Sequence, residues 1–247
     1  MWIKKLLLIL CLCSICQADW GSLENFTGYT EVDPGDDVTV AENTITWVDI
    51  NTRNTDTHVY RDKSAAHFNG DFSHRFKLNI TKLVFNALFY PWLIANSIDD
   101  AQGLVSAGDK DFQGIHLYEN AGHYYIRLSI IENGVRNDTG LTEEISLATD
   151  YYITVERDDD GGANNTGQLT CRVYTTNYYG EAGAVEVHTF TLDCKAGEQN
   201  DFRYLYATNS HNTGAANRLV SGTIDDLDLG EASPFVGGGQ VIMVEEF

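Results

Sequence analysis

Hydrophobic and polar side chains alternate with a period of two along most of this 247-residue chain. In residues 72–80, Phe, His, Phe, Leu and Ile fill one set of alternate positions, and Ser, Arg, Lys and Asn fill the other. Successive side chains of a strand point to opposite faces, so this pattern predicts a half-buried β-strand. The same pattern predicts eleven strands in all, at residues 44–50, 58–62, 72–80, 84–95, 114–119, 124–132, 151–157, 168–175, 185–192, 202–208 and 220–229, with shorter pieces near Tyr29 and Val38.

Short segments rich in Gly, Asn and Asp separate these strands. They lie at residues 33–36, 69–71, 133–134, 160–162 and 180–183. Such segments favour tight turns, and no segment shows the apolar stripe of a helix. The chain therefore predicts one all-β domain, an antiparallel β-sandwich, which commonly reaches this length.

The N-terminus has the three parts of an export signal. Lys4 and Lys5 precede an apolar run at residues 6–16, and the small Ala18 precedes a polar residue. This predicts a signal peptide over residues 1–18, a secreted, extracellular protein and a folded domain over residues 19–231. The apolar run is shorter than the roughly 20 residues that a membrane span needs, so no membrane span is expected.

The charge balance narrows the choice of partner. There are 16 Lys and Arg against 36 Asp and Glu, which gives a formal net charge of −20. Nucleic acid is excluded as a partner, because binding it requires a basic surface. The acidity favours solubility or, as the other explanation, binding of calcium or life in a salty medium.

Two cysteines lie beyond the export signal, Cys171 and Cys194. They fall in or next to the neighbouring strands 168–175 and 185–192, which would fold about the turn at 180–183. An exported protein meets an oxidising environment, so a disulfide across this hairpin is the prediction. Two buried free thiols are the alternative.

The pattern of strands stops after Leu229. Residues 232–247 are predicted to form a flexible C-terminal tail, with three glycines at 237–239 followed by Val-Ile-Met-Val at 241–244. A plain tail is one interpretation. The other is self-association, in which the apolar tip adds a strand to a neighbouring subunit.

Four segments carry a family resemblance. They are residues 29–34 (Tyr-Thr-Glu-Val-Asp-Pro), 95–100 (Ala-Asn-Ser-Ile-Asp-Asp), 151–158 (Tyr-Tyr-Ile-Thr-Val-Glu-Arg-Asp) and 221–227 (Ser-Gly-Thr-Ile-Asp-Asp-Leu). Together they resemble the concanavalin A-like lectin and glucanase superfamily, in its laminin-G-like branch. The resemblance covers about residues 29–229 and implies a jelly roll. It also implies a calcium ion at the rim of the sandwich, while leaving activity open.

Two acidic loops are the candidates for that calcium site. One contains Asp99 and Asp100, and the other contains Asp158 and Asp160. Carboxylate and carbonyl oxygens on loops are the ligands that calcium prefers. Plain solvated turns are the alternative for both loops.

A carbohydrate site is expected at Tyr90, Trp92 and Asn96, which occupy alternate positions of one predicted strand. Flat aromatic rings stack on sugars, and amides hydrogen-bond to sugar hydroxyl groups. The alternative is that Trp92 fills the core.

A catalytic carboxylate pair is the remaining candidate. Residues 226–231 (Asp-Leu-Asp-Leu-Gly-Glu) resemble the catalytic strand of laminarinase-type hydrolases, with Asp226 and Glu231 as the pair. The first residue is Asp rather than Glu and Glu231 follows the strand, so no enzyme is expected. The sequence favours a secreted, non-catalytic module that binds a glycan or cell-surface polysaccharide, or mediates adhesion. The alternatives are a structural surface or virion protein and a laminarinase-type glycoside hydrolase.

Overall fold

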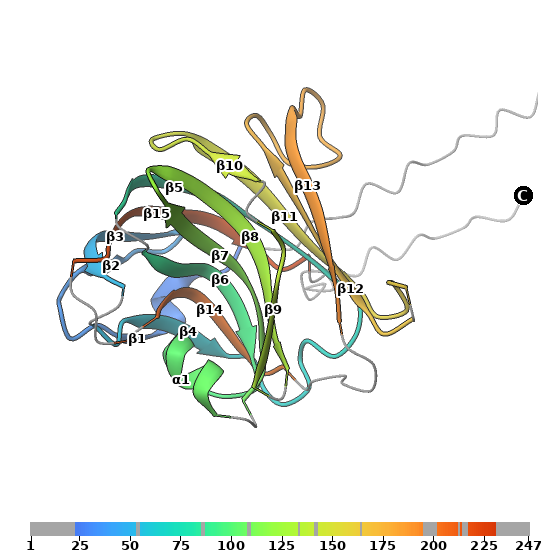
Figure 1. The fold of residues 1–247 in the computed structure, drawn as a ribbon, viewed down its shortest axis with the longest axis horizontal. Helices are drawn as coiled ribbons and strands as arrows, with labels where there is room; N and C mark the ends of the chain where they lie inside the picture. Colours follow the sequence, from blue (N-terminus) through green and yellow to red (C-terminus); the bar gives the residue numbers. More distant parts are fainter. Residues whose placement is uncertain are drawn as a thin grey trace, which may run out of the picture.

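The computed structural model describes residues 23–52, 55–84, 87–107, 110–132, 134–140, 143–163, 165–194, 202–211, 213 and 217–230. In these residues two antiparallel β-sheets curve over one another (Figure 1). The predicted fold class, an all-β antiparallel sandwich, is confirmed.

The first sheet, called sheet A, contains eight strands in the described part of the chain. In spatial order they are β1 (Thr30–Val32), β4 (His58–Asp62), β14 (Tyr204–Ser210), β6 (Leu88–Ala95), β7 (Phe112–Asn120), β8 (His123–Glu132) and β10 (Glu144–Ile145), with β9 (Val135–Asp138) also paired to β8.

The second sheet, sheet B, contains seven strands within the same ranges. Their order is β13 (Glu186–Asp193), β12 (Gln168–Tyr174), β11 (Asp150–Asp158), β5 (Phe72–Leu83), β15 (Leu219–Asp228), β3 (Thr44–Asn51) and β2 (Val38–Val40). A 3₁₀-helix, η1 (Phe26–Gly28), and a short α-helix, α1 (Ala101–Ser106), complete the elements.

The main core lies between the sheets and follows the predicted alternation. On β5, Phe76, Leu78 and Ile80 are buried against sheet A, whereas Arg75, Lys77 and Asn79 lie on the outer face. Gly222 of β15 permits a close approach of the strands, because a Cβ there would lie 2.2 Å from the carbonyl oxygen of Asn79.

A second apolar cluster lies on the outer face of sheet A, where α1 packs. Its buried members are Tyr90, Leu93, Ala95, Ala101, Leu104, Phe112, Ile131 and Tyr206. A helix of six residues has too few internal hydrogen bonds to be stable alone, so this packing holds α1 in place. Part of the outer face of sheet A is therefore covered.

The predicted position of Trp92 beside Tyr90 is wrong. The pairing of β6 with β7 shifts register between Phe89 and Trp92, so the alternation is broken there. Tyr90 lies on the outer face of sheet A, whereas Trp92 is fully buried in the core between the sheets, within 5.5 Å of the ring of His74. The expected sugar-stacking pair does not exist.

The predicted disulfide is also wrong, because Cys171 and Cys194 are free and buried. The hairpin register places Cys171 opposite Phe190, four positions before Cys194. Four residues of strand span roughly 13 Å, and a disulfide needs Cα atoms closer than about 7 Å.

Several expectations fall outside the described residues. The signal peptide at 1–18, Glu231 and the tail at 232–247 belong to this group. Within the residues that are described, no helix is long and apolar enough to cross a membrane.

Candidate active site

A polar row crosses the outer face of sheet A from strand to strand. The cross-strand pairs His58 with Asn209, Asn209 with Tyr90, and His116 with Arg127 place these five side chains side by side on β4, β14, β6, β7 and β8. Tyr90 and His116 close the row by stacking, with ring centroids 4.8 Å apart and planes inclined by 11°. Strands are spaced about 4.8 Å apart, so the row is roughly 19 Å long.

His116 lies in this row and is held by two arginines. Its Nδ1 atom accepts a hydrogen bond from Arg127 Nε at 2.9 Å and another from Arg136 Nη2 at 2.8 Å. A guanidinium group can only donate, so Nδ1 carries no proton. The neutral ring therefore has its proton on Nε2.

Asp138 and Ser129 complete the cluster around the arginines. Arg136 Nε lies 2.9 Å from Asp138 Oδ1, and Arg127 Nη2 lies 3.4 Å from Asp138 Oδ2. Ser129 donates a hydrogen bond to the same carboxylate. One carboxylate thus offsets two guanidinium charges, and the cluster keeps a net positive charge in a strongly acidic protein.

Tyr90 forms the floor of the cluster. Its side chain is fully buried, and this burial raises the pKa of its hydroxyl group. Gly114 leaves room for the ring, because a Cβ at that position would lie 3.3 Å from Tyr90 Cδ1 and 3.0 Å from the carbonyl oxygen of Trp92.

Tyr118 and Tyr125 lie next to the cluster on the same face of sheet A. They form a cross-strand pair between β7 and β8, and both are partly exposed. The guanidinium carbon of Arg127 lies 4.9 Å from the centroid of the Tyr118 ring, a cation–π contact. Two phenol groups and two guanidinium groups are therefore partly exposed on the same face of sheet A.

Asn96, the third predicted sugar-binding residue, has a structural role. Its backbone N–H donates to Asp111 O at 3.1 Å, and its Oδ1 accepts from Asp111 N at 3.0 Å. Asn96 thereby closes the base of the loop that carries α1. Of the three predicted residues, Tyr90 alone lies in the cluster.

The four carboxylates predicted for calcium lie in two separate loops. Asp99 pairs with Lys110 at 2.7 Å, and Asp100 accepts a hydrogen bond from Gly103 N at 2.8 Å as the N-cap of α1. Asp158 accepts from the N–H of Asp160 at 3.1 Å within the other turn. Across the described residues, no three His, Cys, Asp or Glu side chains are grouped so that they could hold a metal ion. Calcium binding stays a prediction.

The carboxylates of the hydrolase motif lie on the other sheet. Asp226 occupies an irregularity of β15 in sheet B with a φ of 54°, and Asp228 is buried 3.4 Å from Arg75 Nη2. They are separated from the cluster on sheet A by the core, and Glu231 lies outside the described residues.

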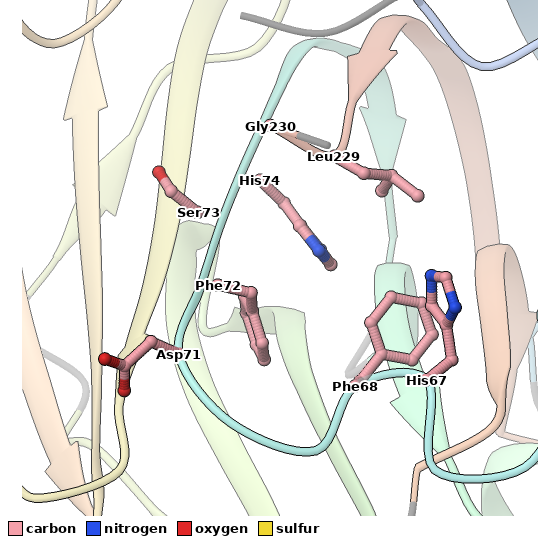
Figure 2. Close-up of a pocket in the computed structure, with 8 residues that line it drawn as sticks. All are labelled: His67, Phe68, Asp71, Phe72, Ser73, His74, Leu229 and Gly230. Carbon is pink, nitrogen blue, oxygen red and sulfur yellow. The ribbon is translucent and has the colours of Figure 1, made fainter. Parts of the chain in front are cut away.

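A pocket of about 520 Å³ lies at one end of the sandwich (Figure 2). Phe68, Phe72 and His74 form its inner wall, while the carboxylate of Asp71 points away. The His74 ring stacks on Phe72 at 4.4 Å, and burial lowers the pKa of His74 to about 3. The prediction of a core histidine on β5 is consistent with this packing, and the pocket presents apolar rings rather than a reactive pair.

Sequence reasoning missed His116, Tyr118, Arg127, Arg136 and Asp138. A signal for three of them was present, because His116 and Tyr118 alternate with Ile115 and Leu117, and Arg127 alternates with Ile126 and Leu128. The turn at residues 121–122 between these strands could have indicated that the three polar side chains share one face.

Comparisons with solved structures give the fold. The alginate lyase Aly36B matches with a TM-score of 0.53 at 11% identity, over 85% of this chain and 91% of that chain. An alginate lyase from Aplysia kurodai matches with a TM-score of 0.51 at 8% identity, over 85% and 97%. Alginate lyase PA1167 from Pseudomonas aeruginosa matches with a TM-score of 0.50 at 11% identity, over 80% and 86%. No family model and no curated protein sequence matches the chain.

These findings correct the functional expectation. The structures that share this sandwich are mostly polysaccharide lyases, which speaks against the expected non-catalytic binding module and against the expectation of no enzyme. The concanavalin A-like sandwich is supported at the level of the fold, and the laminin-G-like branch remains a resemblance.

Proposed function

We propose that this protein cleaves an acidic polysaccharide by β-elimination at the cluster on the outer face of sheet A. The observation that carries the proposal is the pair Arg127 and Arg136, fixed by His116 and Asp138 beside the open Tyr118. The shared fold with three alginate lyases supports it.

The arginines fit the first requirement of this reaction. Removing a proton from the carbon next to a carboxylate puts negative charge on that carboxylate, and preorganised guanidinium groups stabilise such charge. His116 fixes both arginines through Nδ1, so it is a positioning residue. Because its ring is fully buried, it does not itself reach the substrate.

The tyrosines fit the second requirement. Tyr118, beside the guanidinium group of Arg127, is the general base that takes the proton from the carbon beside the carboxylate. The electron pair forms a carbon–carbon double bond, and the bond from the next carbon to the glycosidic oxygen breaks. Tyr125, opposite Tyr118, gives its proton to that leaving oxygen.

The direct test is an assay on alginate and glucuronan that follows the ultraviolet absorbance of the new double bond. We expect activity in the unaltered protein and a loss of about 100-fold or more in Arg127→Ala and Tyr118→Phe. Arg172→Ala is the matched control, because Arg172 pairs with Glu156 at 3.2 Å on the outer face of sheet B. No product from any polyuronate, with all variants folded by circular dichroism, would refute the proposal.

The role of His116 has its own readout. Asn places an amide oxygen near the position of Nδ1, so His116→Asn should keep more of the arginine geometry than His116→Ala. We expect KM to rise more than kcat falls in the alanine variant and the asparagine variant to recover part of the loss. Equal kinetics for the two variants would remove the positioning role.

The export signal and the calcium loops extend the proposal. We propose that the enzyme meets its substrate outside the cell, on the basis of residues 1–18. Detection of the mature protein in culture medium, starting near Asp19, tests this.

Calcium titration of the purified protein, followed by thermal unfolding, tests whether the two acidic loops bind calcium.

A further inference from the structure

The loop that joins β6 to β7 forms a wall on part of the outer face of sheet A, beside the candidate active site. The side chains of Ala101 and Leu104 of α1 are fully buried in the cluster that contains Leu93 and Tyr206. A helix with its side chains is about 10 Å across. A polysaccharide therefore cannot pass between α1 and the sheet.

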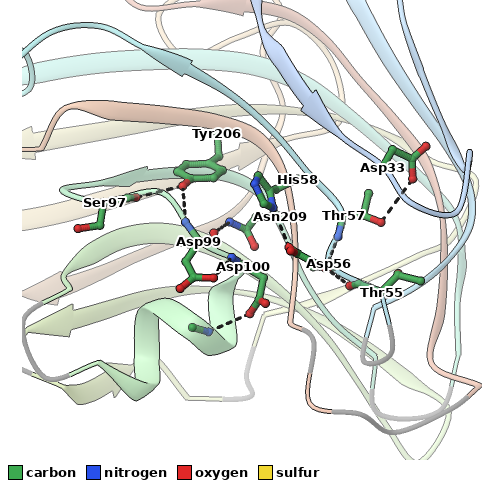
Figure 3. Close-up of polar contacts among 12 residues, drawn as sticks. Asp33, Thr55, Asp56, Thr57, His58, Ser97, Asp99, Asp100, Tyr206 and Asn209 are labelled. Atoms are coloured by element: carbon green, nitrogen blue, oxygen red, sulfur yellow. Dashed lines mark hydrogen bonds and ion pairs between the residues drawn. The ribbon is translucent and has the colours of Figure 1, made fainter.

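Hydrogen bonds from β14 hold this wall at its start (Figure 3). Asp99 N donates to the Tyr206 hydroxyl at 3.1 Å, and that hydroxyl donates to Ser97 O at 3.0 Å. Asn209 Nδ2 donates to Asp99 O at 3.1 Å. Two residues of the strand beneath therefore bind the segment that leads into α1.

The loop is also closed on itself. The Asp99–Lys110 ion pair at 2.7 Å joins its two sides, and the Asn96–Asp111 hydrogen bonds close its base. Gly103 keeps the helix close to Asp99, because a Cβ there would lie 2.2 Å from the carboxylate carbon. The wall is thus a built part of the fold.

The polar row has a buried part and a partly exposed part, and the loop covers the buried part at Asn209. Four members of the row are buried: His58, Asn209, Tyr90 and His116. The fifth member, Arg127, is partly exposed, and so are its neighbours Tyr118, Tyr125 and Arg136 on β7, β8 and β9. The partly exposed part extends from β7 to β10 and is only roughly 10–15 Å wide at the usual strand spacing.

We propose that α1 and its loop close one end of the substrate site, so that the protein removes short products from a chain end of an acidic polysaccharide. This inference rests on the proposed function. A chain bound at Arg127 and Arg136 extends from the loop toward β10, and its end lies against the loop. Cleavage in the middle of a long chain is then blocked.

The main experiment compares the unaltered protein with a loop-excised variant in which residues 97–110 are replaced by Asn-Gly. Asn96 and Asp111 are already paired, and Asn-Gly suits a two-residue hairpin turn. We expect the unaltered protein to release short unsaturated products from the first time points while solution viscosity falls slowly. The variant should lower the viscosity quickly and give a broad range of lengths.

A milder variant keeps the inference testable if the loop-excised variant does not fold. Tyr206→Phe removes the hydroxyl that binds Ser97 and Asp99 but keeps the ring, and it should shift products toward greater lengths. Tyr174→Phe is its control, because Tyr174 is also a buried tyrosine, with a 2.6 Å hydrogen bond to Glu186 on sheet B. It should leave the product lengths unchanged.

Binding separates this inference from the proposed function. Calorimetry with uronate oligosaccharides of increasing length should show affinity that stops rising after a few sugars, and that keeps rising in the loop-excised variant. If affinity stops rising after a few sugars but no cleavage is seen, only the proposed function is refuted. Rapid internal cleavage by the unaltered protein would refute only the closed end of the substrate site. If no oligosaccharide bound, both this inference and the proposed function would be refuted.

Discussion

At the scale of single residues, Trp92 shows how a side chain's role depends on which face it occupies. It is fully buried between the sheets, in contact range of Phe72 and His74. Truncating a buried tryptophan leaves a large cavity, so Trp92→Ala should lower the free energy of unfolding by about 3–5 kcal/mol. Urea unfolding measures this loss.

The matched comparison for Trp92 is Tyr118→Ala, on the partly exposed face of β7. We expect it to change the free energy of unfolding by less than about 1 kcal/mol, because surface changes usually have small effects. Equal losses for the two variants would contradict the placement of Trp92 in the core.

His74 predicts a dependence of stability on pH. Burial lowers its pKa to about 3 in the folded protein, against about 6.5 in the unfolded chain. Between these values the unfolded chain binds a proton that the folded protein does not, so stability falls as pH falls from about 6.5. One such group contributes a slope of at most about 1.4 kcal/mol per pH unit. His74→Phe should make the dependence shallower between about pH 6 and pH 4, as measured by urea unfolding at several pH values.

The control for His74 is His123→Gln. The His123 side chain is 58% exposed and lies 2.8 Å from Glu144. Its removal should leave most of the pH dependence in place. An unchanged slope in His74→Phe would show that other groups cause it.

At the scale of elements, the register of the β12–β13 hairpin sets the state of the two cysteines. Burial raises the pKa of Cys194 to about 11 and raises that of Cys171 well above its ordinary value. Only thiolates react quickly, so both side chains should resist alkylation in the native protein and react after unfolding. Mass spectrometry of the alkylated peptides measures this, and a disulfide-linked peptide would overturn the register.

The same register explains which parts of the fold the sequence predicts. Alternation is a local property, so strands such as β5 and β8 were predicted almost at their observed positions. Irregularities are set by pairing with distant strands. The register shift between Phe89 and Trp92 moved one predicted site residue into the core, and the four-position offset from Phe190 to Cys194 removed the predicted disulfide.

The candidate site was hidden for a related reason. His116, Arg127 and Asp138 lie on three strands and meet only through two hairpin registers. Each residue alone looks like an ordinary polar position of a half-buried strand. Arg136 adds a further difficulty, because its cross-strand partner on β8 is Ile131, four residues from Arg127, and yet its side chain reaches His116. Pairing the strands first would have found the first three residues, but not the reach of Arg136.

At the scale of the whole molecule, the net charge and the proposed substrate have the same sign. The formal charge is −20, so the protein as a whole repels a polyuronate, while Arg127 and Arg136 attract its carboxylates at short range. Salt at about 0.1 M screens charges more than about 10 Å apart, and it weakens partly buried contacts much less. Added salt should therefore remove the repulsion first.

The overall repulsion and the local attraction by the two arginines respond differently to salt, and this predicts the sign of the salt effect on catalysis. The kcat/KM for a long polyuronate should rise between about 10 and 150 mM NaCl, because association of two like-charged partners becomes faster as their repulsion is screened. A uronate trisaccharide carries few charges, so its kcat/KM should change much less over the same range. Initial rates at low substrate concentration measure both. A rate that falls steadily from the lowest salt would mean that the field at the opening is positive, and that the arginine cluster rather than the acidic surface governs the approach of the substrate.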